Sequence, residues 1–169
     1  MARIEHTVEV DCPLEVVWDV WSDVRRLPEL SKSTTEVRGA PPRLTQVGDT
    51  FCQIAKAAGK AAAVEWTVTS IRPGDHLTIE GSPGFGVKAS ITERVRALPD
   101  GKTALTLEAD YQLPFGPLGR VVSRLGLDRL AMRESCEVLD GVARLARQAR
   151  DERARDERAA AGAPRPAAS

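Results

Sequence analysis

Two ionisable residues fall on strand faces that the pattern of the sequence predicts to be apolar. Glu93 has the same two-residue phase as Ile91 and Val95, which would turn its carboxyl group toward the interior. Burial raises the pKa of a carboxyl group, so Glu93 could act as a general acid or base. Tyr111 also lies on an apolar face, where its hydroxyl group would need a partner from the protein or from a ligand. We take Glu93 and Tyr111 as candidate catalytic residues; the alternatives are a rim carboxylate and a core tyrosine.

Other kinds of catalytic or metal site have little support in the sequence. His6 has no acidic or cysteine partner at a metal-binding spacing, and His76 follows a predicted turn. The three cysteines are odd in number and far apart, which is typical of neither a disulfide framework nor a zinc motif. The chain also lacks nucleophile-elbow, P-loop, GxGxxG and HExxH motifs. We therefore expect no metal and no cofactor.

The periodicity of apolar residues predicts the elements that would position these side chains. Residues 3–10 alternate as a strand, and two short helices follow up to about residue 30. Pro13 suits the first turn of the first helix, and Asp23 is expected to cap the second, which should end around Leu27-Pro28. Six further strands are predicted at residues 34–38, 49–58, 62–71, 76–80, 87–97 and 103–113, followed by a long helix from about 117 to 150.

This order predicts an α+β fold in which a curved, seven-stranded antiparallel sheet faces one long C-terminal helix. One helix cannot fill the concave face of such a sheet, so a cavity is expected between them. Gln53 could orient a carbonyl or hydroxyl group of a ligand, and Trp66 could stack on a flat ligand or simply fill the core. The residues expected to contact the ligand are Phe51, Gln53, Trp66, Phe85, Val87, Leu107, Ala109, Leu125 and Met132.

Length and charge restrict the classes of function. The 169 residues suit one domain, which we place at 1–150, and the remaining residues 151–169 are predicted to form a charged helical extension and a disordered tail. Lys plus Arg and Asp plus Glu number 24 each, so the chain has no net positive field to attract nucleic acid. No apolar run approaches the roughly 20 residues of a membrane span. We expect a cytoplasmic protein, either a monomer or a homodimer.

Several short segments, in this order and at this spacing, resemble the START/Bet v 1 helix-grip superfamily, and in particular its bacterial polyketide cyclase/dehydrase-like members. The segments are Val8-Glu9-Val10-Asp11-Cys12-Pro13, Val16-Val17-Trp18, Leu27-Pro28-Glu29-Leu30, Val47-Gly48-Asp49-Thr50-Phe51, Glu65-Trp66-Thr67-Val68-Thr69, Ile71-Arg72-Pro73 and Leu113-Pro114-Phe115-Gly116-Pro117-Leu118-Gly119. The resemblance covers about residues 3–148 and implies an apolar cavity between the sheet and the long helix.

One departure from the resembled proteins bears on the reaction. The aromatic polyketide cyclases that the chain resembles place an arginine on the strand that bears the tryptophan, whereas the in-phase positions here are Val68 and Ser70. An aliphatic cavity would suit a lipid-like or terpenoid ligand better than a polyphenolic one. We expect a protein that binds a hydrophobic small molecule, polyketide-like or lipid-like, and that could promote its cyclisation or dehydration. The alternatives are a non-catalytic carrier and an interaction module.

Overall fold

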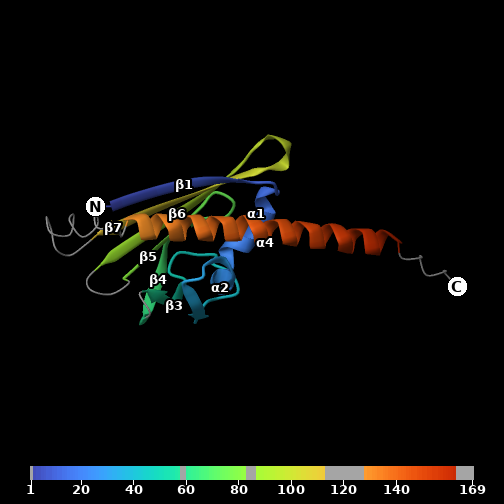
Figure 1. Cartoon of the computed structure of the whole chain (residues 1–169). Helices are drawn as coiled ribbons and strands as arrows, with labels where there is room; N and C mark the ends of the chain where they lie inside the picture. The colour runs from blue at the N-terminus through green and yellow to red at the C-terminus, as the bar shows by residue number, and fades with distance from the viewer. Residues whose placement is uncertain (1, 58–59, 83–86, 113–127, 163–169) are drawn as a thin grey trace.

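A single antiparallel sheet organises the computed structural model, which describes residues 2–57, 60–82, 87–112 and 128–162 (Figure 1). The seven strands lie in the order β1-β7-β6-β5-β4-β3-β2. From β2 to β7 each strand pairs with the next one in the chain, whereas β1 pairs with β7 and lies at the opposite edge of the sheet from β2. Their bounds are β1 Ala2–Val10, β2 Thr34–Arg38, β3 Thr50–Ala57, β4 Lys60–Arg72, β5 His76–Gly81, β6 Lys88–Ala97 and β7 Thr103–Gln112.

The helical elements lie between β1 and β2, between β6 and β7, and at the C-terminal end. They are α1 Leu14–Ser22, the 3-10 turn η1 Val24–Arg26, α2 Leu27–Leu30, the 3-10 turn η2 Pro99–Gly101 and α4 Asp128–Gly162. The predicted α+β class, the seven-stranded antiparallel sheet, the short helices after the first strand and the long C-terminal helix are all confirmed. The fold is the helix grip, in which a curved sheet partly surrounds one helix (Figure 1).

The predicted bounds of the second short helix were wrong. Leu27 begins α2 rather than ending a helix, and Pro28 lies in its first turn. A proline is tolerated there because the first N–H groups of a helix have no partner within it. Asp23 does not cap η1 with its side chain; instead its carboxylate accepts two hydrogen bonds from Arg25, at 2.7 and 2.8 Å.

The long C-terminal helix α4 continues past the domain boundary expected at residue 150. Its described part runs from Asp128 to Gly162, whereas the expected beginning near residue 117 and the tail beyond 162 lie outside the described residues. Arg150 pairs with Asp11, and Arg153 pairs with Asp19 on α1, at 3.3 and 2.7 Å. The end of α4 nevertheless extends beyond the sheet (Figure 1).

The central turns of α4 pack against β1, α1 and α2. The apolar residues buried there are Leu139, Val142, Ala143, Leu145 and Ala146. Gly141 permits the closest approach, because a Cβ atom at this position would lie 2.8 Å from both the Cα and the carbonyl oxygen of Leu30. The helix is thus held at one edge of the sheet and by α1 and α2, rather than pressed onto the middle of the sheet.

Candidate functional site

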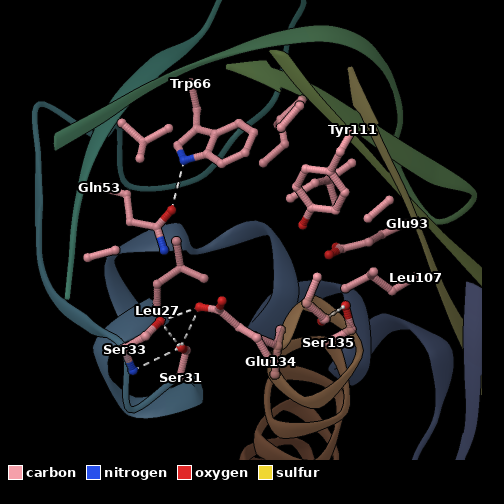
Figure 2. Close-up of a pocket in the computed structure, with 18 of the residues that line it drawn as sticks. Leu27, Ser31, Ser33, Gln53, Trp66, Glu93, Leu107, Tyr111, Glu134 and Ser135 are labelled. Carbon is pink, nitrogen blue, oxygen red and sulfur yellow. Dashed lines mark hydrogen bonds between the residues drawn. The ribbon is translucent and has the colours of Figure 1, made fainter. Parts of the chain in front are cut away.

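A cavity of about 370 Å³ lies between the concave face of the sheet and α4 (Figure 2). Its floor is the inward face of β3 to β7, and its other walls come from α1, the segment around α2 and the first described turns of α4. The lining is mostly apolar and consists of Trp21, Leu27, Ser31, Ser33, Phe51, Gln53, Ala55, Lys56, Ala62, Val64, Trp66, Ile79, Ala89, Ile91, Glu93, Leu107, Ala109, Tyr111, Ala131, Glu134, Ser135 and Val138.

The strand register brings these residues onto one face. Cross-strand partners include Phe51 with Trp66, Ile91 with Ala109, and Glu93 with Leu107. Directly paired residues of an antiparallel sheet point to the same side, so lining residues far apart in sequence become neighbours. Four of the floor positions are alanines, which leave volume between the sheet and α4; they are Ala55, Ala62, Ala89 and Ala109.

The amide group of Gln53 is committed within the protein. Its Oε1 accepts a hydrogen bond from the indole Nε1 of Trp66 at 2.8 Å, and its Nε2 donates to the hydroxyl of Thr34 at 2.6 Å (Figure 2). Gly81 makes room for the indole ring, because a Cβ atom there would lie 2.7 Å from Trp66 Cε3. Gln53 therefore fixes the orientation of Trp66 on the cavity wall, which limits the role in ligand orientation that the sequence suggested.

A second polar group closes the side of the cavity beside α2. Ser33 donates a hydrogen bond to the carboxylate of Glu134 on α4, and the Ser31 hydroxyl donates to the same oxygen at 3.4 Å (Figure 2). Ser135 turns its hydroxyl back to the carbonyl oxygen of Ala131 at 2.9 Å. The two hydrogen bonds to Glu134 connect the segment that follows α2 to α4.

Glu93 is the buried carboxyl group of the cavity. Its side chain is only 3% exposed, and its Oε2 is buried with no hydrogen-bond partner in the described part of the chain. Its partners on the adjacent strands are Leu77 and Leu107, both buried. Burial raises the pKa of Glu93 well above its ordinary value, because the apolar surroundings disfavour the charged form. Burial therefore favours the neutral, protonated form of Glu93.

Tyr111 lies on β7 near Glu93, and Figure 2 shows its hydroxyl group and the Glu93 carboxyl group directed into the same part of the cavity. Burial raises the pKa of the Tyr111 hydroxyl, and the negative charge of Glu134 raises it further. The phenol therefore stays protonated and can either donate or accept a hydrogen bond. Together, Glu93 and Tyr111 can donate protons or hydrogen bonds to a molecule in the cavity.

The structure places seven of the residues proposed from the sequence on the cavity wall: Phe51, Gln53, Trp66, Glu93, Leu107, Ala109 and Tyr111. Val87 precedes β6, which begins at Lys88, and does not line the cavity. The expected place of Met132 in the lining was wrong, because its side chain is 37% exposed. Phe85 and Leu125 lie outside the described residues.

The error at Met132 has a geometric cause. The cavity-facing positions of α4 are Ala131, Glu134, Ser135 and Val138, at spacings of three and four residues. This row begins one position before Met132, and one residue is a rotation of about 100° around a helix of 3.6 residues per turn. The polar residues Glu134 and Ser135 interrupt an otherwise apolar row, which could have indicated the cavity-facing side of α4. The predictions from the sequence did not include these two residues.

Neither a metal cluster nor a membrane helix is found in the described ranges. Their His, Cys, Asp and Glu side chains form no group of three or more that could hold a metal ion. None of the helices described is both long and apolar enough to cross a membrane.

Comparison with known proteins places this geometry among related folds. Residues 1–148 match the sequence profile of the family described as "Polyketide cyclase / dehydrase and lipid transport". Toxin Rv0910 of Mycobacterium tuberculosis is 23% identical over 125 residues, which are 73% of this chain and 86% of the toxin.

Solved structures show the same fold at low sequence identity. The Zhui aromatase/cyclase from Streptomyces sp. R1128 superposes with a TM-score of 0.74 at 20% identity, covering 87% of this chain and 94% of the other. The structure of Ara h 8.0201 gives a TM-score of 0.67 at 14% identity, with coverage of 87% and 98%. At these identities the likeness establishes the fold alone.

The buried Glu93 should give the protein a specific pH dependence of stability. Because the folded state holds this proton more tightly than the unfolded chain, the free energy of unfolding should fall as the pH rises from about 4.5 through the raised pKa. Glu93→Gln cannot ionise, so the wild type should lose stability relative to this variant as the pH increases. Urea denaturation at several pH values measures the difference.

Glu80→Gln is the control for this experiment, since it replaces an exposed carboxylate on the neighbouring strand β5. Its stability profile should run parallel to that of the wild type. Parallel profiles for the wild type and Glu93→Gln would instead show that Glu93 has the same pKa in the folded and unfolded states, which would contradict the effect of burial.

Proposed function

Because the chain belongs to the family of polyketide cyclases, dehydrases and lipid-transport proteins, we propose that it binds a polyketide-like or lipid-like molecule in the cavity beneath α4. The observation that carries the proposal is the cavity itself. Its volume of about 370 Å³ falls in the range of roughly 300 to 1,000 Å³ that is usual for small-molecule sites. A mostly apolar wall with a few polar groups is also typical of such sites.

The wall favours a hydrophobic occupant for energetic reasons. Burying apolar surface is favourable by roughly 25 cal/mol per Å², and a ligand would also restore packing contacts that the alanine floor leaves unmade. Trp66, held by Gln53, offers a rigid aromatic surface. The ligand need not displace a buried ion pair at Glu93, because burial favours the neutral form of this residue and its Oε2 has no partner in the described chain.

A second candidate function is catalysis of cyclisation or dehydration in the same cavity. It is favoured by the common orientation of two protonated groups, Glu93 and Tyr111, either of which could transfer a proton to a bound molecule (Figure 2). Holding a flexible chain in a reactive conformation would also lower the barrier. The in-phase β4 positions that follow Trp66 are Val68, which is buried, and Ser70, and neither is the arginine that the resembled cyclases place on this strand, so any catalysis would depend on other groups.

Binding can be tested with the neutral fluorescent probe N-phenyl-1-naphthylamine (NPN). The wild type should enhance its fluorescence saturably, and Ala109→Phe, which adds a ring to the cavity floor, should weaken binding by about tenfold or more. Asp110→Phe is the matched control, because residue 110 lies on the opposite face of β7 and this variant should bind as the wild type does. Absence of saturable binding, or equal binding by all three proteins, would contradict the proposal.

Catalysis can be tested with a poly-β-ketone thioester analogue in single-turnover reactions. If the cavity catalyses, Tyr111→Phe and Glu93→Gln should each lower the cyclisation rate by roughly 100-fold, the usual scale of a lost proton donor. The affinity of each variant for NPN is measured alongside, which separates a loss of rate from a loss of binding. A wild-type rate no higher than the rate without protein would leave a carrier as the function.

A further inference from the structure

The orphaned carboxyl group of Glu93 indicates the chemical class of the ligand. A polar atom that is buried without a hydrogen bond destabilises the folded protein, so most buried polar atoms in proteins have a hydrogen-bond partner. Glu93 is 3% exposed, lines the cavity, and leaves Oε2 without a partner in the described part of the chain. The described residues that surround it on β5 and β7 are apolar, so a partner is most readily supplied by the cavity's occupant.

We propose that the ligand is a neutral apolar molecule with a carbonyl oxygen, and that this oxygen accepts a hydrogen bond from the protonated carboxyl group of Glu93. This proposal rests on the proposed binding function. A neutral carboxyl group has one O–H donor, and a ketone or ester oxygen accepts it without bringing a charge into the cavity. The nearby Tyr111 hydroxyl can donate a second hydrogen bond to the same oxygen (Figure 2).

A second orphaned group supports an acceptor on the ligand. Trp21 lines the cavity from α1, and its indole Nε1 is buried with no hydrogen-bond partner in the described chain. An indole N–H can only donate. Ser22 Oγ is also buried without a partner in the described chain, but Ser22 does not line the cavity. Since Glu93 in its protonated form also donates, the two unsatisfied groups of the cavity wall call for oxygen acceptors rather than for donors.

The charges that face the cavity disfavour an anionic ligand. From α4, Glu134 presents a carboxylate, and from β7, Tyr111 presents a phenol. The sole cation among the described lining residues is Lys56 on β3, whose side chain is exposed. The described neighbours of Glu93 on β5 and β7 are Leu77 and Leu107. A fatty-acid carboxylate would therefore approach like charge without a buried counter-ion.

The experiment compares three ligands with the same twelve-carbon length: 2-dodecanone, dodecanoate and dodecylamine. Each ligand is titrated at neutral pH into the full chain with bound NPN, and the concentration needed to displace the probe is measured. We expect the ketone to displace NPN at concentrations about tenfold or more below those of the carboxylate and the amine. Preference for dodecanoate would overturn the proposal, and preference for dodecylamine would show that a carboxylate of the wall governs binding and would overturn it as well.

Variants at position 93 assign the preference to this carboxyl group. Glu93→Leu removes the donor and should weaken ketone binding about tenfold relative to that variant's own affinity for NPN. Glu93→Gln retains an N–H donor and should restore the ketone preference. Ketone affinity of the wild type should fall as the pH rises through the pKa of Glu93, whereas that of Glu93→Gln should not.

These outcomes separate the two levels of the argument. If the wild type does not bind NPN, the proposed binding function fails. If it binds NPN but shows no ketone preference, or shows the same preference and pH dependence in all position-93 variants, the assignment of the ligand class fails alone. Circular dichroism establishes that each variant is folded, and the comparison of the wild type with Glu93→Gln decides the question if Glu93→Leu does not fold.

Discussion

The packing of α4 against β1, α1 and α2 determines which part of the interior stays unfilled. Gly141 lets the helix approach the backbone of Leu30, while the floor of the cavity carries alanines at four positions among its larger side chains. The sheet curves away from a straight helix, so contact at one edge leaves space over the central strands. The cavity is thus a consequence of where close packing is achieved, and the polar groups on its wall take their character from this enclosure.

Two polar residues on the cavity wall, Gln53 and Glu93, have different roles because only one of them has hydrogen-bond partners within the described protein. Gln53 has internal partners for both ends of its amide, so it contributes rigidity to Trp66. Glu93 has apolar neighbours and an unpartnered oxygen, so its carboxyl group becomes a neutral donor that faces the cavity. Both lie on the same inward face of the sheet. The difference between a structural and a functional candidate lies in whether the protein itself satisfies the hydrogen-bonding groups.

Much of the fold could be predicted from the sequence because successive side chains of a strand point to opposite faces of the sheet, so alternating apolar residues identify the inward face. The in-phase positions of β6 and β7 have a regular register between Lys88 and Gln112, so the inward orientation of Glu93 and Tyr111 was accessible from periodicity. On α4 a one-residue error rotates a side chain by about 100°, which is why Met132 was misplaced. The partners of Gln53 depend on Thr34 and Trp66 meeting across two strand pairs, which no local pattern specifies.

The proposed function requires an unfilled apolar cavity between the sheet and α4, and xenon-pressurised crystals would test for this cavity most directly. Xenon enters empty apolar cavities without needing a specific hydrogen bond, so the test does not depend on the identity of the ligand. The account predicts xenon density above the floor formed by Ala89 and Ala109, with α4 in place. A crystal structure in which side chains fill this volume and xenon is absent from it would contradict the account.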